Sequence, residues 1–107
     1  MAIPMNDVTS EVLREATERM HGCTAKLTHV LSVTEKFESK TAWEGVVHIF
    51  DLDGHPTATR AYAWSSPIEG STKRRFYAVL HVPPVTSPAD AVRAAIVAEH
   101  RRELRKP

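Results

Sequence analysis

The feature that most constrains the fold is an Asp53-Gly54 pair set between two strand-like runs. The runs cover residues 42–51 and 57–65, and both are rich in β-branched and aromatic side chains, which favour extended backbone. Asp-Gly between such runs is a strong signal for a tight two-residue turn in which both central residues have positive φ. The sequence therefore predicts an antiparallel hairpin that reverses direction at Gly54.

A two-residue turn would also fix which side chains face each other across this hairpin. On one face of the sheet it places Gly45 opposite Tyr62 and Trp43 opposite Trp64. A bare glycine beneath an aromatic ring, followed by a facing pair of tryptophans, is a favourable cross-strand combination. Pro56 follows the turn closely, so a four-residue loop fits this sequence equally well.

The stretch VVHIFDLDG (46–54) resembles the opening motif of the haloacid-dehalogenase phosphatases. The resemblance implies that Asp51 attacks phosphate and that Asp53 acts as acid and base. The chain departs from the family where His55-Pro56 replace its threonine and where a strand-like segment follows. A parallel neighbour would need a crossover of about a dozen residues or more, and none is available here. We therefore favour the hairpin and keep a phosphatase-like hydrolase as the lowest-ranked alternative.

A helix is predicted at each end of the chain. Apolar residues recur along 7–21 and form one stripe. The stripe consists of Val8, Val12, Leu13, Ala16 and Met20. Asn6 or Asp7 would cap this helix, and Gly22 would end it. Near the other end, Ser87 is placed to cap a helix that starts at Pro88 and continues through residues 91–105. Val92, Ala95 and Ile96 share a face of that helix, with Glu99 as a further candidate.

Four strands are expected between the helices, at residues 25–37, 42–51, 57–65 and 73–82. The order α-β-β-β-β-α and the short connections indicate an antiparallel meander. A chain of 107 residues suits one core. The fold class predicted for residues 1–107 is therefore a single α+β domain. We expect a two-layer sandwich with the N-terminal and C-terminal helices on one side of the sheet.

Composition excludes several classes of protein. The chain is 42% hydrophobic and 25% charged, which is typical of a globular protein and unlike a disordered one. Its single cysteine, Cys23, excludes an internal disulfide and fits a reducing compartment. No apolar run approaches the roughly 20 residues that span a bilayer. The N-terminus lacks the pattern of a secretory signal. We expect a cytoplasmic protein without a membrane segment.

Charge is distributed unevenly along the chain, although the net charge is only +1. Residues 1–57 have a net charge of −4 and residues 58–107 a net charge of +5. The asymmetry indicates an anionic partner or, as we favour, neutralisation of one half by the other. The basic candidates for binding an anion are Lys73, Arg74, Arg75, Arg101 and Arg102. Together with neighbouring aromatic rings they make nucleic-acid binding an alternative function, but the low net charge argues against it.

The sequence gives little indication of metal or catalytic chemistry. Six histidines are present, but none shows the His-x-x-x-His spacing of a compact metal site, and the chain has no Cys-x-x-Cys pair. Cys23 has no flanking signature of a catalytic thiol, so a structural thiol is the default interpretation. We predict no metal site and no cofactor, and we favour a protein that is not an enzyme.

The aromatic face of the hairpin is the strongest candidate for a binding surface. Trp43, Tyr62 and Trp64 share this face, with Arg60 at its rim. If both helices cover the other face, these residues form an exposed apolar patch of the kind that marks an interface. We then expect a homodimer, acting as a small interaction or ligand-binding module of unspecified ligand. The alternative is that this face is itself the core beneath a helix, because both faces of the sheet carry apolar residues.

Overall fold

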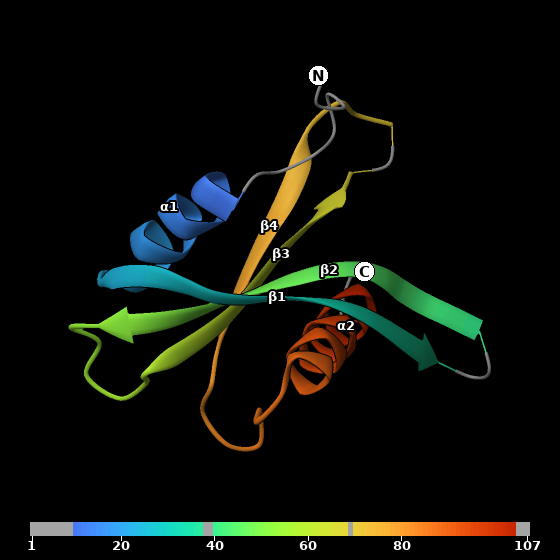
Figure 1. The fold of residues 1–107 in the computed structure, drawn as a ribbon. Helices are drawn as coiled ribbons and strands as arrows, with labels where there is room; N and C mark the ends of the chain where they lie inside the picture. Colours follow the sequence, from blue (N-terminus) through green and yellow to red (C-terminus); the bar gives the residue numbers. More distant parts are fainter. Residues whose placement is uncertain (1–9, 38–39, 69, 105–107) are drawn as a thin grey trace.

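The computed structural model describes residues 10–37, 40–68 and 70–104. A four-stranded sheet lies between two helices (Figure 1). The elements in chain order are α1 (Ser10–His21), β1 (Thr24–Phe37), β2 (Lys40–Asp53), β3 (Arg60–Pro67), β4 (Arg74–Leu80) and α2 (Pro88–Leu104). The strands follow one another across the sheet in the order β1-β2-β3-β4, and every neighbouring pair is antiparallel. The predicted α-β-β-β-β-α order and the antiparallel meander are confirmed.

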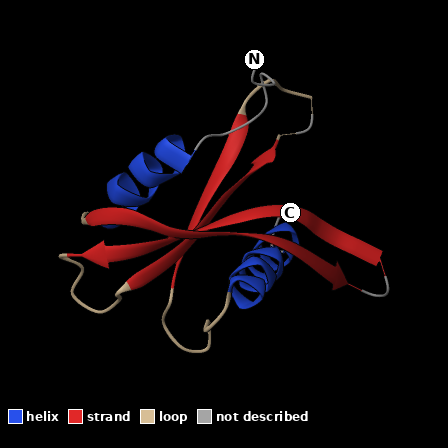
Figure 2. Ribbon diagram, viewed as in Figure 1, coloured by secondary structure: helices blue, strands red, loops and turns tan. Residues whose placement is uncertain are grey.

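The helices lie on opposite faces of this sheet, which differs from the expected two-layer arrangement (Figure 2). Successive residues of a strand point to opposite faces, and in β3 they divide between two cores. Tyr62 and Trp64 belong to a core with Val92 of α2, whereas Ala63 belongs to a core with Leu13 of α1. We call these the α2-side core and the α1-side core. The aromatic face is therefore covered by α2, as the alternative interpretation of the sequence held.

The β2–β3 hairpin forms, but its register differs from the predicted one. Tyr62 pairs with Ile49 instead of Gly45, because residues 54–59 form a longer loop between the strands. The His55 side chain stabilises this loop, since its Nδ1 accepts hydrogen bonds from the backbone N–H groups of Thr57 (3.1 Å) and Ala58 (2.9 Å). The displacement covers an even number of residues, so the predicted sets of side chains on each face stay together.

A bulge in β1 lets this strand contribute to both cores. The register of β1 against β2 shifts between Leu27 and His29. Ala25, before the bulge, belongs to the α1-side core, and Val33, after it, belongs to the α2-side core. Two residues eight positions apart would otherwise point to the same face.

Helix α1 meets the sheet through only part of the expected stripe, namely Leu13 and Ala16, together with Thr17. Leu13, Ala16 and Thr17 are its buried residues, whereas Val12 and Met20 are 42% and 48% exposed. Residues that recur every four positions shift gradually around a helix with 3.6 residues per turn. Positions 13, 16 and 17 lie closer together on one face. Thr17 is tolerated in the core because its hydroxyl donates to the Leu13 carbonyl (2.8 Å). Val8 and the candidate caps Asn6 and Asp7 lie outside the described residues.

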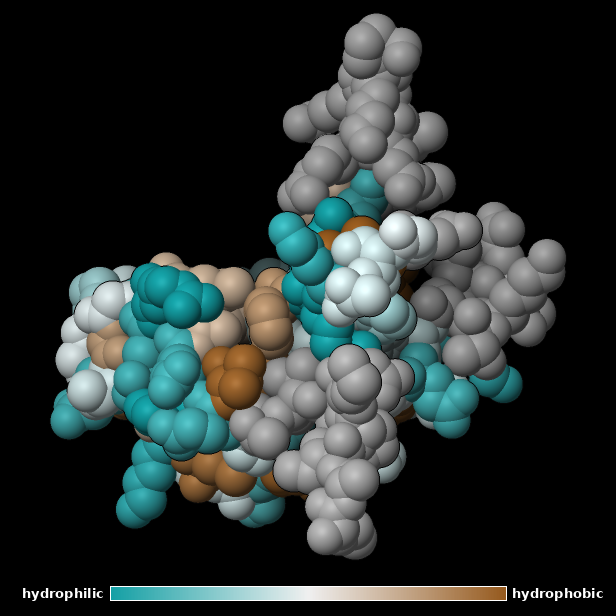
Figure 3. All heavy atoms as spheres, turned by 90° about the horizontal axis from the view of Figure 1, so that it is seen from above, coloured by the Kyte–Doolittle hydropathy of each residue, from teal (hydrophilic) through white to brown (hydrophobic). Residues whose placement is uncertain are grey.

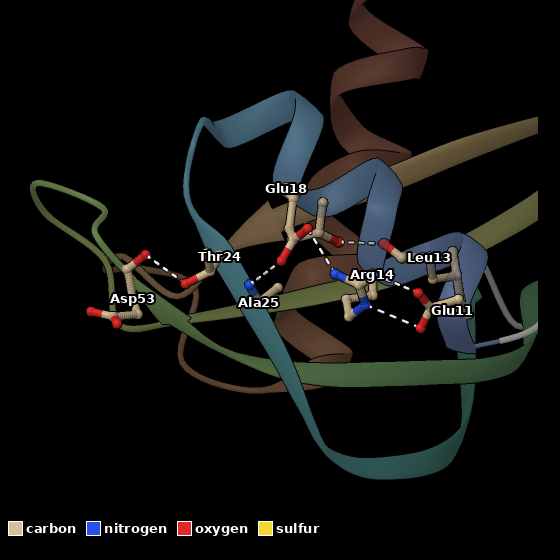
Figure 4. A network of polar contacts seen from close by, with 8 residues as sticks. Glu11, Leu13, Arg14, Glu18, Thr24, Ala25 and Asp53 are labelled. Carbon is tan, nitrogen blue, oxygen red and sulfur yellow. Dashed lines mark hydrogen bonds and ion pairs between the residues drawn. The ribbon is translucent and has the colours of Figure 1, made fainter.

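Polar contacts fix α1 against the start of β1 (Figure 4). Arg14 lies between Glu11 and Glu18 and donates hydrogen bonds to both carboxylates. Glu18 also accepts a hydrogen bond from the backbone N–H of Ala25 (2.8 Å). This backbone bond is the main cause that lowers the pKa of Glu18. Gly22 ends the helix with a φ of 64°, as predicted.

Helix α2 starts as the sequence predicts and is joined to the far edge of the sheet. The Ser87 hydroxyl accepts a hydrogen bond from the backbone N–H of Asp90 (3.1 Å), which is the geometry of an N-cap. Arg93 donates from Nε to Glu35 of β1 (2.7 Å). Glu35 comes from the acidic half of the chain and Arg93 from the basic half, so this ion pair is one contact through which the halves neutralise each other. Within the described ranges no helix is long and apolar enough to cross a membrane.

Candidate ligand-binding pocket

A cavity of about 370 Å³ lies between α2 and one end of strands β2, β3 and β4. We call it the aromatic pocket. On the sheet side it is lined by Trp43, Trp64, Ser66, Pro67, Arg75 and Tyr77, and by Ile68, which directly follows β3. From the helix it is lined by Val92, Ala95, Ile96 and Glu99. The helical residues follow the i, i+3, i+4, i+7 spacing of one face, which explains why all four reach the same cavity.

Three aromatic rings form one wall of the aromatic pocket. Trp64 and Tyr77 are cross-strand partners, and their rings stack with centroids 5.1 Å apart and an angle of 11° between planes. The Trp43 ring lies 5.9 Å from that of Trp64. These separations fall within the range of favourable aromatic pairs. The two tryptophans are thus in contact, as the sequence predicted, although they are not direct partners in the observed register.

The position of the Trp43 ring depends on Gly45, two residues later in β2. A Cβ atom on Gly45 would lie 2.8 Å from the Trp43 ring, so the absence of a side chain there lets the ring lie against the strand. The Trp43 Nε1–H donates to the Ser66 hydroxyl (3.0 Å), which fixes the other side of the ring. The glycine beneath an aromatic ring was predicted, but the ring is that of Trp43 and not of Tyr62.

Polar groups meet on the side of the pocket where β4 faces α2. The Tyr77 hydroxyl and the Arg75 Nη1 (3.1 Å) both donate to Oε1 of Glu99. Burial raises the pKa of Tyr77, and the bond to Glu99 adds to this effect. Hydrogen bonds to Tyr77 and Glu99 raise the pKa of Arg75. Tyr77 is therefore a neutral donor and Arg75 a fixed cation at neutral pH. This group can bind and orient a ligand, but it offers no activated nucleophile.

The structure brings together part of the predicted aromatic surface and separates the rest. Trp43, Trp64 and Arg75 meet in the aromatic pocket. Tyr62 is 1% exposed and lies deeper in the α2-side core. Arg60 lies at the opposite end of β3, paired with Asp51 across the β2–β3 ladder. Because α2 covers this face, Tyr62 and Trp64 do not present an open surface to a second sheet.

The predicted basic residues do not converge on one surface. Arg74 and Arg75 are consecutive in β4 and point to opposite faces of the sheet, where Arg74 donates to Ser65 (2.8 Å). Lys73 is exposed just before the strand. Arg101 lines a groove on another side of α2, and the side chain of Arg102 lies outside the described residues. The described cations thus lack the single stripe that a nucleic-acid surface requires.

The other sequence hypotheses can be placed against the same geometry. Asp51 and Asp53 lie at the end of an antiparallel strand, and residues 54–59 lead into β3, so the strand lacks the parallel setting that the phosphatase resemblance implies. Within the described ranges, no group of three or more His, Cys, Asp or Glu residues could hold a metal ion.

Sequence reasoning missed two polar residues that define the pocket. Tyr77 shares a strand face with Arg75, and this alternation could have been read from residues 73–82. Glu99 was noted as sharing a helix face with Val92, but nothing in the sequence indicated that this face meets β4. Comparison of the chain with protein-family models, curated proteins and solved structures finds no match.

Proposed function

We propose that this protein is a small-molecule-binding module whose ligand occupies the aromatic pocket. The observation that carries the proposal is a cavity of about 370 Å³ in which aromatic rings and a few polar groups face each other. Ligand pockets in proteins commonly measure about 300–1,000 Å³ and combine apolar walls with a small number of placed polar groups. The aromatic pocket meets both criteria.

The lining of the pocket suggests the chemistry of the ligand. Trp43, Ile68 and Ile96 offer apolar surface suited to a flat hydrocarbon or aromatic body. Among the described residues, the two bonds to Glu99 both use Oε1, which leaves Oε2 to accept from a ligand. Ser66 accepts from Trp43 and retains its own hydroxyl proton for donation. A planar molecule with one hydrogen-bonding end fits this arrangement.

The proposal is for binding and not for catalysis, because the Tyr77 hydroxyl is bonded to Glu99 and the pKa of Tyr77 is raised. We also propose a cytoplasmic location. It rests on the single cysteine, Cys23, which is free and partly buried.

Filling the cavity from the helix tests the proposal. The probe is anilinonaphthalene sulfonate, a planar apolar dye with one polar end, whose fluorescence rises on binding. Ala95→Leu adds three carbons inside the pocket, and we expect it to weaken dye binding by about tenfold or more, the usual effect of a steric change in an apolar site. The matched control is Ala94→Leu on the exposed neighbouring position, which should bind as wild type.

Circular dichroism of both variants would show that the fold is retained. Equal dye affinity in the two leucine variants would contradict the proposal, as would wild-type binding that does not saturate.

We further propose that the protein forms a homodimer, now through the α1 side of the sheet. The supporting observation is that Val30 and Val46 are 49% and 44% exposed, on the same face as α1 and beside the edge strand β1. Seen from above, the described surface shows apolar patches between hydrophilic residues (Figure 3). An edge strand flanked by exposed apolar residues is a common site of association.

Light scattering tests the dimer. Wild type should have twice the chain mass, and Val30→Lys should reduce it to that of the monomer, since a charge on this strand opposes association. Val82→Lys, at an exposed position after β4, should leave the mass unchanged. A monomeric wild type at millimolar concentration would rule the dimer out.

A further inference from the structure

A second cavity, of about 410 Å³, lies at the opposite end of β3 from the aromatic pocket. Asp51, Leu52, Thr59, Arg60 and His81 line it. Asp51 and Arg60 are direct partners across β2 and β3, and the backbone N–H of His81 donates to the Arg60 carbonyl (2.8 Å). Their three side chains therefore form a row across neighbouring strands, on the sheet face that also carries α2.

A buried tyrosine holds the histidine of this row. The Tyr62 hydroxyl lies 2.5 Å from Nδ1 of His81, and Tyr62 is 1% exposed. Burial raises the pKa of Tyr62, while the nearby charge of Arg60 acts in the opposite direction. Tyr62 is therefore protonated at neutral pH and has one proton to donate.

The hydroxyl proton determines which nitrogen of His81 is protonated. Arg60 has donors but no acceptor, so it cannot take the proton of the Tyr62 hydroxyl. If Nδ1 of His81 carried a proton, the buried hydroxyl would be left without an acceptor among these neighbours, which is costly. The Tyr62 hydroxyl is thus the donor to Nδ1, and a neutral His81 carries its proton on Nε2. His81 becomes a fixed N–H donor.

Arg60 supplies further donors beside this N–H group. Its Nε lies 3.4 Å from Oδ1 of Asp51, a contact that uses one of the five guanidinium N–H groups. Arg60 also has a hydrogen bond to Tyr62, which engages a further part of the guanidinium group. The Arg60 side chain is 42% exposed, so part of the guanidinium group is accessible to solvent. Thr59 also lines this cavity. Donors from Arg60 and His81 therefore line a space that is open to solvent.

We propose that this second cavity binds the carboxylate of a small organic acid between Arg60 and His81. A carboxylate presents two coplanar oxygens, which match the fork of a guanidinium group. Asp51 decides between anions, because its negative charge repels a dianionic phosphate twice as strongly as a monoanionic carboxylate. Tyr62 acts as a positioning residue, since it keeps the donor nitrogen of His81 available without touching the ligand.

Nuclear magnetic resonance of the full chain tests the site with sodium acetate as the probe. Acetate should produce saturable shifts of the Arg60 Nε–H and His81 ring signals, whereas sodium chloride at the same ionic strength should not. The imidazole nitrogen spectrum should show His81 protonated at Nε2. Equal shifts with chloride, tighter binding of inorganic phosphate than of acetate, or a proton on Nδ1 would each overturn the proposal.

Three variants give the proposal separate signatures. Arg60→Gln should weaken acetate binding by about tenfold or more, the loss expected for a charged hydrogen bond, while Arg19→Gln on the exposed side of α1 should not. Tyr62→Phe should make the His81 tautomers mix and weaken acetate binding, which a merely structural role would not do. Asp51→Asn should strengthen binding of acetate and of phosphate. Unchanged acetate affinity in Arg60→Gln, or phosphate binding that does not respond to Asp51→Asn, would overturn it.

Discussion

Among single residues, His48 has an unusual environment in the middle of β2. Its side chain is 9% exposed and its ring stacks on that of Phe50. Within the described structure its Nδ1 is buried and has no hydrogen-bond partner. Burial lowers the pKa of His48 below its usual value of 6.5, because the charged imidazolium is poorly solvated there. The folded protein thus holds this histidine in its neutral form.

This environment predicts a loss of stability in acid. The pKa of His48 is lower in the folded than in the unfolded state. The contribution of His48 to the free energy of unfolding is therefore complete above the unfolded pKa of about 6.5. It is lost as the pH falls below that value toward the folded pKa, because the unfolded state takes up the proton first. His48→Phe should reduce this slope and raise the free energy of unfolding by about 1–3 kcal/mol, the cost of an unsatisfied buried group.

Urea denaturation at several pH values between neutrality and mild acid measures the slope. His29→Phe, a substitution of an exposed histidine on β1, is the control and should keep the wild-type dependence on pH. An unchanged slope in His48→Phe would show that other groups cause the acid sensitivity.

Residues that act through their side chains on backbone groups were the hardest to predict. The Asp53-Gly54 signal correctly located the reversal, and Gly54 does have a positive φ of 93°. The loop is longer than the signal implies because His55 caps two backbone N–H groups, a role more typical of Asp, Asn, Ser or Thr. Such a contact depends on the folded loop and leaves no pattern in the sequence.

At the scale of elements, the start of α2 is a local feature that the sequence predicts well. The Ser87 hydroxyl caps the first turn, and Asp90 in turn accepts from the backbone and side chain of Thr86. Ser87→Ala should lower the free energy of unfolding by about 1 kcal/mol, the usual value of an N-cap. Thermal or urea unfolding measures the change. Ser87→Thr retains the hydroxyl and should recover most of the loss, and equal losses in both variants would mean that the cap is unimportant.

The elements themselves were predicted better than the surfaces they bury. Strand alternation and helix periodicity depend on neighbouring residues, so all four strands and both helices were found within a few positions. The buried stripe of α1 was wrong at Val12 and Met20, because Thr17 replaces them in the core. A threonine enters a core when its hydroxyl finds an acceptor on its own helix, and periodicity based on apolar residues does not include that case.

At the scale of the whole molecule, the sheet separates two hydrophobic cores. Which face each helix covers depends on contacts between distant parts of the chain, and the sequence left both arrangements open. The aromatic pocket follows from this choice, since it exists only where α2 lies over Trp43, Trp64 and Tyr77. The sequence therefore predicted two of its rings and one of its cations without predicting that they form a pocket.

Separate cores predict additive effects of mutations. Leu13→Ala in the α1-side core should cost about 2–5 kcal/mol and Ile49→Val in the α2-side core about 0.5–1.5 kcal/mol. The double variant should equal their sum within about 0.5 kcal/mol, as for sites that share no partners. Ile49→Val with Val92→Ala, both in the α2-side core, provides the comparison and should deviate from additivity. A coupling above about 1 kcal/mol across the sheet, measured by urea denaturation, would contradict this separation.

The division of β3 into large and small side chains also protects the strand against misalignment. Tyr62 and Trp64 face α2, whereas Ala61 and Ala63 face α1, and none of the four meets water. In a sheet with one wet face, a slip of one residue is penalised by exposing apolar groups. Both faces of β3 are buried, so a shift of one residue would be penalised sterically. It would force two bulky rings into the space of two methyl groups. Side-chain volume, more than polarity, thus disfavours a shifted register of this strand during folding.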